Sequence, residues 1–438
     1  MPTQFDPPSG TRDFLAEEFE RRERAFAAIR SVFGGYGFEP LQTPAFERLD
    51  VLMGKYGDEG DKLIFKIMRR GEHEASGEAD LALRYDLTVP LARVAAAYGS
   101  RLPSPYKRYA IGPVWRADRP GKGRYREFVQ CDLDTLGSIS PIADAEVICA
   151  QHDALVALGV TDFTILLNSR QVLAGLLDAY DIPEQTGPRA LIVLDKLDKL
   201  RPEAVASELR DMGLGDKAGE LVRALTADDS HERIRLALKP SERAMAGLSA
   251  LDDLLALVSA ELPPDRIVFT PRMVRGLSYY TGPIWEHVAP GIPGSLGGGG
   301  RYDHLIGQLG GPEVPATGAS LGIERILMVQ GPDVAPRRRL DVAVAVLDQR
   351  YAVQCYSFAA ASRAAGLRSS VYLGSSGKLG RQLRWAADQG ARWCLIYGSA
   401  EQEAGTVTVR DMTSGEQTPV LPGNLTAYLA AAAGLTEG

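Results

Sequence analysis

Cysteine and histidine are scarce in this chain. Its 438 residues include four cysteines and five histidines. The cysteines lie far apart and form no Cys-x-x-Cys pair, so the sequence predicts neither a disulfide framework nor a metal site built from Cys and His. We expect the four thiols to be reduced and mostly buried.

Long apolar runs are also missing. No segment reaches the roughly 18 apolar residues of a membrane span, and residues 1–20 are charged and lack the apolar core of a secretory signal. We therefore expect a cytoplasmic protein with no membrane partner. The net charge of −7 argues against a surface coated for nucleic-acid binding, although a local basic face needs only a few clustered Lys and Arg residues.

The chain is long enough for two or three domains, with 45% apolar residues to fill their cores. Residues from about 144 to 265 are mainly helical and carry no chemical motif, which indicates an inserted helical module at about 170–262. Beyond a Pro- and Arg-bearing linker at 331–338, strands and helices alternate through 339–438. That alternation predicts a separate α/β domain with parallel strand pairing.

Two predicted strands, 109–116 and 127–136, are joined by a basic loop. In the second strand Gln130, Asp132 and Asp134 recur at every second position and therefore face the same side of the sheet. A polar row of this kind is either a solvated face or the floor of a binding site. The apolar residues between them are expected to pack against helices behind the sheet, which favours the floor.

Arginines, paired tyrosines and glycines gather in one stretch of the chain. Arg275 is followed by tyrosines at 279–280, glycines at 297–300, Arg301 and finally Arg325. Glycines let the backbone pass close to a ligand, and arginines suit a ligand that bears negative charge. Taken singly, the glycine run is typical of a surface loop and the tyrosines of core packing. Together they favour a binding site.

Seven blocks, in chain order, resemble the histidyl-tRNA synthetase family, a branch of the class II aminoacyl-tRNA synthetases. Each block alone is a weak signal, but the seven in order span nearly the whole chain. They are Gly10–Phe14, Thr43–Glu47, Leu83–Thr88, Arg116–Asp134, the segments that begin at Arg275 and at Gly298, and the one that ends in Glu324 and Arg325.

The resemblance implies an α+β fold. We expect the antiparallel sheet of a class II synthetase flanked by helices in a catalytic domain at 1–330, and a C-terminal α/β domain of the anticodon-binding type at 339–438. It also implies a homodimer, because the apolar, Pro-fixed segment from Phe38 to Phe46 usually lies at the subunit interface in this family.

The activity implied is ligation of L-histidine to tRNA(His). Such enzymes join histidine to ATP, release pyrophosphate, and pass the histidyl group from the adenylate to the terminal ribose of the tRNA. ATP is then a substrate and Mg²⁺ the expected cofactor, because positioned cations stabilise the charge of phosphoryl chemistry.

The resemblance assigns arginines to the reacting phosphate. Arg116 and Arg275 are the predicted catalytic residues: Arg116 would hold the α-phosphate, and Arg275 the histidine carboxylate and the α-phosphate during attack. Arg325 would bind the outer phosphates of ATP. Asp118 stands two residues after Arg116, where many class II enzymes have a Glu that reads the adenine amino group, so the resemblance implies that Asp118 binds ATP there.

Histidine recognition needs a carboxylate that accepts a ring N–H and a hydroxyl for the other nitrogen. By resemblance Asp134 and Tyr280 read the ring, with Tyr279 beside them. The remaining set would take the substrate ammonium and carboxylate groups: Asp86, Thr88 and Gln130. Gln130 and Asp134 both belong to the second predicted strand, and their assignment agrees with the independent period-two pattern of that strand.

Contacts with tRNA are implied at two places. The basic loop is expected to close over ATP and meet the acceptor end of the tRNA, with Arg124 as the candidate. In the C-terminal domain the candidates are Lys378, Arg381 and Arg384. A solvated hairpin tip and an ordinary charged helix surface are the alternatives for these two groups.

Ser278 departs from the family pattern, which usually has Asp there. Without the Asp carboxylate, Arg275 lacks a possible orienting partner. The same family fold leaves an alternative: a catalytically inactive paralogue that serves as a histidine-sensing regulatory subunit of ATP phosphoribosyltransferase. Such proteins typically lack the anticodon domain and lose catalytic arginines, whereas this chain retains both. A tRNA-binding sensor without ligase activity is a third interpretation.

Overall fold

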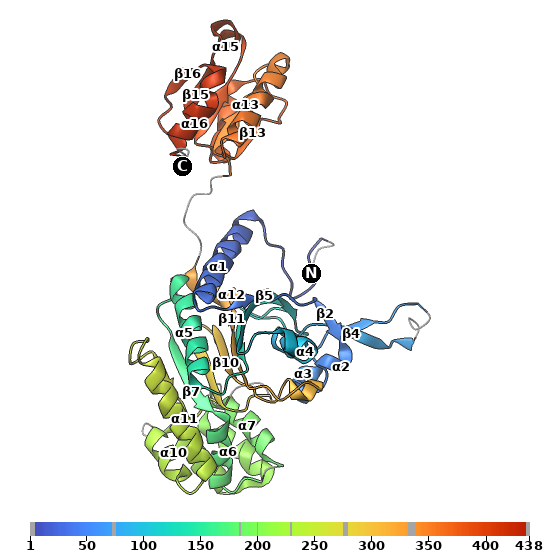
Figure 1. Ribbon diagram of the computed structural model, residues 1–438, viewed down its shortest axis with the longest axis vertical. Helices are drawn as coiled ribbons and strands as arrows, with labels where there is room; N and C mark the ends of the chain where they lie inside the picture. Colours follow the sequence, from blue (N-terminus) through green and yellow to red (C-terminus); the bar gives the residue numbers. More distant parts are fainter. Residues whose placement is uncertain are drawn as a thin grey trace. The chain divides into compact units, whose positions relative to one another are not determined.

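The computed structural model describes residues 5–71, 76–183, 185–198, 200–227, 230–274, 279–331 and 339–434. The chain divides into two compact units, 1–331 and 332–438, and each is described by itself (Figure 1). Among the described residues, no helix combines the length and apolar character needed to cross a membrane. All four cysteines are buried, as predicted.

An eight-stranded sheet forms the centre of the first unit. Its two outer pairs, β1 with β5 and β7 with β8, are parallel, and all pairs between them are antiparallel. In spatial order the strands are β1 (Glu39–Pro40), β5 (Tyr106–Trp115), β6 (Glu127–Leu136), β11 (Ala316–Gly322), β10 (Gly297–Arg301), β9 (Pro283–Val288), β7 (Thr164–Ser169) and β8 (Ile267–Phe269).

Helices α1 (Ala16–Gly35), α5 (Pro141–Ala157) and α12 (Ile323–Gln330) lie together along this sheet (Figure 1). Phe26, Ile29 and Phe33 of α1 are buried in the same apolar cluster as Cys131 and Leu133 of β6. The apolar positions of β6 therefore pack against helices, as predicted. Phe19 of α1 is 54% exposed, so the buried side of this helix begins further along the chain, at Arg22.

A second apolar cluster lies beside a small antiparallel sheet of β2 (Phe46–Arg48), β4 (Ala79–Leu83) and β3 (Lys66–Met68). Three helices accompany it: α2 (Leu49–Leu52), α3 (Gly57–Asp61) and α4 (Thr88–Tyr98). The chain passes from β4 into α4 through residues 84–87. The polar turn between them faces the cavity described below.

The inserted helices follow β7 and precede β8. They comprise α6 (Arg170–Ala179), α7 (Gly187–Leu194), η3 (Asp195–Asp198), α8 (Pro202–Leu209), η4 (Arg210–Leu214), α9 (Lys217–Thr226), α10 (Ser230–Leu238) and α11 (Glu242–Val258). The sequence prediction of mainly helical structure from about 144 missed β7. A short apolar run such as Thr164–Ser169 does not separate a buried strand from a buried helix by periodicity.

The second unit contains a five-stranded sheet. Its strand order is β13 (Ser369–Val371), β12 (Val342–Val344), β14 (Trp393–Ile396), β15 (Val407–Asp411) and β16 (Gln417–Val420), with α13 (Ala352–Ala364), α14 (Leu379–Asp388), α15 (Ser399–Ala404) and α16 (Leu425–Ala433). The first three strands pair in parallel, as expected, whereas β15 and β16 pair antiparallel. The last two strands follow each other through a short turn, which permits only antiparallel pairing.

Candidate active site

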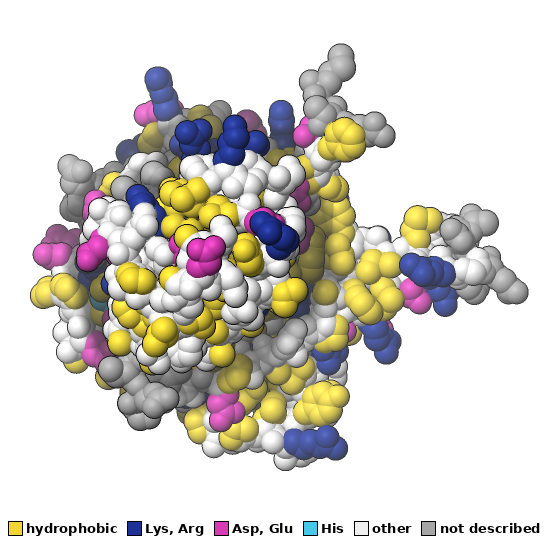
Figure 2. All heavy atoms as spheres, turned by 90° about the horizontal axis from the view of Figure 1, so that it is seen from above, with side chains coloured by type: hydrophobic (Ala, Val, Ile, Leu, Met, Phe, Trp, Pro, Cys, Tyr) yellow, Lys and Arg dark blue, Asp and Glu magenta, His cyan; other side chains and the backbone are white. Residues whose placement is uncertain are grey.

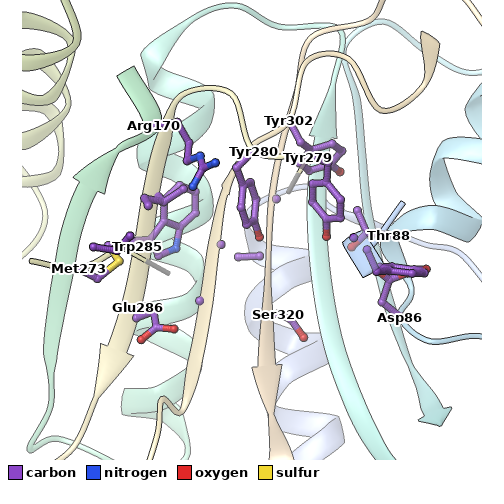
Figure 3. Close-up of a pocket in the computed structure, with 18 of the residues that line it drawn as sticks. Asp86, Thr88, Arg170, Met273, Tyr279, Tyr280, Trp285, Glu286, Tyr302 and Ser320 are labelled. Atoms are coloured by element: carbon purple, nitrogen blue, oxygen red, sulfur yellow. The ribbon is translucent and has the colours of Figure 1, made fainter. Parts of the chain in front are cut away.

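A cavity of about 940 Å³ opens over the middle of the large sheet. Its floor includes residues of β6, β10 and β11, one side comes from the turn before α4, and α6 and α7 supply part of the opposite wall. In Figure 3, Tyr279, Tyr280 and Tyr302 lie between Arg170 and Trp285 on one side and the α4 turn on the other. Helices inserted far away in sequence thus complete the site.

The polar row predicted on β6 forms part of this floor. Gln130, Asp132 and Asp134 are 8%, 1% and 1% exposed, and the first and last of them line the cavity. Opposite Asp134 on the neighbouring strand β11 stands Gly318. A Cβ atom at that glycine would lie 1.9 Å from Asp134 Oδ1, so the carboxylate occupies the space that any other residue at 318 would fill.

Asp134 is held from two directions. The Tyr302 hydroxyl donates to Asp134 Oδ1, and Arg108 Nη2 lies 2.8 Å from Asp134 Oδ2. Burial raises the pKa of the Asp134 carboxyl, while the positive charge of Arg108 and the bond from Tyr302 lower it. These two contacts fix the orientation of the Asp134 carboxylate, which lines the cavity.

Asp86 and Thr88 lie at the start of α4. Asp86 Oδ1 accepts from the backbone N–H of Val89 at 3.0 Å and from the Tyr56 hydroxyl at 3.1 Å. This is helix capping by a carboxylate, which places a negative group at the positive end of the helix. Figure 3 shows Asp86 and Thr88 on the side of the cavity next to Tyr279, and both line the cavity.

Tyrosine rings form the inner wall. The ring of Tyr279 meets those of Tyr280 and Tyr302 edge to face, with centroids 5.1 and 5.7 Å apart. Burial raises the pKa of all three hydroxyls, and neighbouring carboxylates raise the pKa of Tyr280 and Tyr302 further. The tyrosines therefore stay neutral and act as hydrogen-bonding groups on a rigid aromatic wall.

Several buried oxygen atoms around the floor lack a hydrogen-bond partner among the described residues: Asp86 Oδ2, Gln130 Oε1 and Asp132 Oδ1. Gln130 uses its amide nitrogen to donate to Ser320 Oγ at 2.9 Å, which directs its oxygen elsewhere. Buried acceptors are normally satisfied, because leaving one unpaired costs about 1–3 kcal/mol. The floor is suited to a ligand that brings N–H donors.

Arg116 lines the same cavity. Its guanidinium lies over the rings of Tyr85 and Phe128, at 4.3 and 5.1 Å from their centroids, and donates to the Tyr85 carbonyl at 3.1 Å. These contacts hold a positive charge beside the acceptor-rich floor. The predicted phosphate-binding arginine is thus next to the predicted histidine-binding residues.

Arg325, Asp118 and Arg124 do not line the cavity itself. Arg325 Nη1 donates to the Ser295 carbonyl at 2.8 Å, and Arg124 pairs with Asp118 at 2.7 Å. A Cβ atom at Gly123 would lie 3.5 Å from the Arg325 side chain, so the basic loop runs beside that arginine. The three residues form a neighbouring charged group rather than part of the floor.

Two predicted positions fall outside the described residues: Arg275 and Ser278. Arg301, which the sequence pattern grouped with the ligand-facing arginines, has a different role. All three of its guanidinium nitrogens bond to protein oxygens, including Asp144 Oδ2 at 2.6 Å. It therefore joins β10 to α5 as an internal ion pair.

Some cavity residues carried no signal in the sequence. Arg170, Arg189 and Asp195 come from the inserted helices, and Trp285 and Glu286 from β9. Only tertiary packing brings them to the sheet. Ser320 alternates with Gly318 and Gly322 on β11, the strand beside β6, so a strand assignment there would have placed it on the same side of the sheet as the polar row.

Lys378, Arg381 and Arg384 lie at the beginning of α14 and along it, and all three are exposed. Their spacing of three residues places them on one side of the helix. The face in Figure 2 carries Lys and Arg side chains in small separate groups among apolar and acidic ones. The three residues are thus available to a ligand of the second unit, but exposure alone does not identify one.

The histidyl-tRNA synthetase family profile matches residues 10–326, and the profile of an anticodon binding domain matches residues 341–431. This chain belongs to the histidyl-tRNA synthetase family. A histidine–tRNA ligase of Gloeobacter violaceus is 40% identical over 442 residues, which cover 93% of this chain and 94% of the relative. One of Aeropyrum pernix is 40% identical over 432 residues, covering 94% and 95%.

A solved structure of the family supports the same conclusion. Histidyl-tRNA synthetase from Nostoc sp. PCC 7120 superimposes with a TM-score of 0.79 at 29% identity and covers 98% of this chain and 100% of its own. The predicted α+β fold with its C-terminal α/β domain is thereby confirmed. A Bacillus halodurans protein described as an ATP phosphoribosyltransferase regulatory subunit/histidyl-tRNA synthetase, with a TM-score of 0.75 at 21% identity, shares the fold.

Proposed function

We propose that this protein activates L-histidine with ATP to histidyl-adenylate and transfers the histidyl group to tRNA(His). The observation that carries the proposal is the cavity floor, where buried acceptor oxygens of Asp86 and Gln130 and the carboxylate of Asp134 lie beside the guanidinium of Arg116. Such a floor suits an amino acid with several N–H donors and a phosphate next to it.

Histidine would bind with its ring between Asp134 and Tyr280, with Tyr279 packed beside it. The Asp134 carboxylate would accept the ring N–H, and the Tyr280 hydroxyl would pair with the other ring nitrogen. Asp86, Thr88 and Gln130 would take the ammonium and carboxylate groups. A site of paired polar groups rejects apolar amino acids strongly, because they would leave its buried groups unpaired.

ATP would lie with its α-phosphate at Arg116 and its outer phosphates toward Arg325, while Asp118 reads the adenine. Arg275 would bind the histidine carboxylate and the same α-phosphate. The carboxylate oxygen then forms a bond to the α-phosphorus as the bond to pyrophosphate breaks. Cations fixed around this centre stabilise charge that builds up in the transition state.

Mg²⁺ would enter with ATP. Among the described residues no group of three or more His, Cys, Asp or Glu side chains is positioned to hold a metal ion. The carboxylates that line the cavity come from four separate parts of the chain: Asp86, Asp134, Asp195 and Glu286. This donor set fits an ion held mainly by phosphates, which is the usual binding mode of Mg²⁺. When bound, the ion would offset the charge of the outer phosphates.

For tRNA we propose contacts at Arg124 near the catalytic cavity and at Lys378, Arg381 and Arg384 in the second unit. Replacing these last three by Ala should lower charging of tRNA(His) several-fold and leave histidine activation unchanged, because phosphate contacts position the tRNA without touching the adenylate. Equal losses in both assays would contradict this assignment.

We also propose a cytoplasmic homodimer with a catalytic domain at 1–330, a linker at 331–338 and an anticodon-binding-type domain at 339–438. In support of a subunit interface near the segment from Phe38 to Phe46, the side chain of Phe46 is 52% exposed. Light scattering of the purified protein would test the dimer, and the mutation Phe46→Glu should weaken it.

The decisive experiment is amino-acid-dependent exchange of pyrophosphate into ATP. Exchange with histidine alone, lost in Arg275→Ala, would support the proposal. Absence of exchange from folded protein would favour the histidine-sensing paralogue, with Ser278 as the first residue to replace by Asp. That alternative is not favoured, since the histidine–tRNA ligases of Gloeobacter violaceus and Aeropyrum pernix match more than nine-tenths of this chain.

A further inference from the structure

One long side chain stands among small neighbours beneath the cavity floor. On β5 the residues opposite the polar row of β6 are Arg108, Ala110 and Gly112, which face Asp134, Asp132 and Gln130 in turn. On the other side of the row, β11 places Gly318, Ser320 and Gly322. Arg108 is the exception in this frame of small residues, and it stands directly across from Asp134.

Arg108 is fully buried and joins two separate parts of the floor. Its Nη2 atom lies 2.8 Å from Asp134 Oδ2 and donates to the Leu87 carbonyl at 3.0 Å. Leu87 lies between Asp86 and Thr88, so one nitrogen connects the β6 carboxylate to the α4 turn. The other two nitrogens, Nε and Nη1, have no hydrogen-bond partner among the described residues.

The charges around Asp134 are unbalanced without this arginine. The pKa of Asp132 is raised to about 7, mainly by burial; the charge of Arg108 lowers this pKa and the charge of Asp134 raises it. Asp132 itself does not line the cavity. The titratable and charged groups that face Asp134 are Arg108 from β5, Asp132 from β6, Asp86 from the α4 turn, and Tyr280 and Tyr302 from the aromatic wall.

We propose that Arg108 is a positioning residue, which keeps Asp134 ionised as the acceptor for the substrate ring N–H and fixes its distance from Asp86 and Thr88. The inference rests on the proposed function and adds the counter-ion that makes the ring-binding carboxylate usable. Asp132 then acts as a competing negative charge, and the arginine serves both carboxylates.

The test is the pH dependence of histidine-dependent pyrophosphate exchange, from about pH 6 to about pH 9. In Arg108→Met, Asp134 loses its counter-ion and takes up a proton at higher pH. The acidic limb of kcat/KM for histidine should therefore move up by about one pH unit or more. A shift of one unit lowers the ionised fraction at most about 10-fold, so we expect a loss of about 10-fold on the acidic limb that becomes smaller in alkali.

Two further variants separate this role from a structural one. The double variant Arg108→Met/Asp132→Asn removes the second carboxylate along with the arginine. In the upper part of the pH range, where Asp132 is ionised, its kcat/KM should therefore return toward that of the parent protein. Arg301→Met removes a buried arginine whose aspartate partner lies outside the cavity lining. It should lower thermal stability and leave the acidic limb in place.

A uniform loss across the pH range in Arg108→Met, with no recovery in the double variant, would overturn the proposal. If Arg108→Met does not fold, Arg108→Lys provides the test. The acidic limb of kcat/KM should then keep its position, because the ammonium retains the positive charge. KM for histidine should rise, because the ammonium does not bridge Asp134 and the Leu87 carbonyl. A shifted limb in the lysine variant would also overturn it. Failure of the proposed function is distinct, since the parent protein would then show no histidine-dependent exchange.

Discussion

Two buried arginine–aspartate pairs lie among the described residues of the first unit, and they differ in what surrounds the arginine. Arg301 and Asp144 are 2.6 Å apart, with side chains 10% and 3% exposed. Arg108 and Asp134 are 2.8 Å apart, with side chains 0% and 2% exposed. Distance and burial do not distinguish the pair that joins β10 to α5 from the pair under the cavity.

Hydrogen bonding does distinguish them. Every guanidinium nitrogen of Arg301 bonds to a protein oxygen, whereas two nitrogens of Arg108 have no such partner in the described structure. Native proteins rarely leave buried polar groups unpaired without a reason. The difference lies in the guanidinium alone, because each aspartate has one oxygen without a hydrogen-bond partner among the described residues, Asp134 Oδ2 and Asp144 Oδ1. Unused donors on the arginine, more than burial, therefore distinguish the pair under the cavity.

Replacing the two aspartates by asparagine should give the largest difference between the two ion pairs. Asp134→Asn should reduce kcat/KM for histidine about 100-fold or more, because it removes the carboxylate proposed to accept the ring N–H and leaves Arg108 without its ion-pair partner. Asp144→Asn should instead destabilise the fold by about 3 kcal/mol, the usual cost of leaving a buried charge unpaired. Exchange kinetics and denaturation curves on both variants would check this, and similar kinetic losses in the two would contradict it.

Two glycines of β11 that face β6 allow the position of the Asp134 carboxylate to be tested without a change of charge. Gly318→Ala places a Cβ atom on Asp134 Oδ1, at 1.9 Å before relaxation, whereas a Cβ atom at Gly322 meets nothing closer than 3.7 Å. Displacing the carboxylate should raise KM for histidine about 10-fold, as overpacking typically costs 1–3 kcal/mol. Gly322→Ala on the same strand is the matched control, and an equal rise in KM there would show that the effect does not depend on Asp134.

The pH dependence of stability gives a smaller effect. The folded-state pKa of Asp132 is about 7 because of burial, above the ordinary value of roughly 4 for an unfolded aspartate. Between these values the folded state binds more protons, so stability falls as pH rises. Asp132→Asn should flatten that fall, by up to about 1.4 kcal/mol per pH unit. Urea unfolding of both proteins at about pH 5 and about pH 7 would measure it, and parallel slopes would contradict it.

Local patterns were sufficient to predict the polar row of β6 and the apolar residues behind it, because strand alternation fixes which side each residue faces. Arg108 was not singled out. Its place opposite Asp134 follows only from the register of β5 on β6, and a hairpin with a long basic loop does not fix that register in the sequence. Knowing that Trp115 pairs with Glu127 would have been enough to find it.

The glycine run at 297–300 needed tertiary information too. Glycine is depleted in strands, so the sequence favoured a loop, either at the surface or beside a ligand. The run is instead the central strand β10, where a Cβ atom at Gly299 would lie 2.4 Å from the Gly318 carbonyl. The wall contributed by Arg170 and α7 likewise depends on how an inserted helical module packs, which local patterns do not encode.

The smallest expected effect concerns the two faces of β11. Ser320 faces the cavity and accepts a hydrogen bond from Gln130 at 2.9 Å, whereas Thr317 is fully buried and does not line the cavity. Ser320→Ala frees the Gln130 amide to rotate, so KM for histidine should rise about 3-fold, as one neutral hydrogen bond contributes about 1 kcal/mol. Thr317→Ser keeps a hydroxyl on the other face and should leave KM unchanged. If both variants shifted KM equally, the Gln130 contact would have no particular role in binding, because the response would then follow strand packing and not the polar floor.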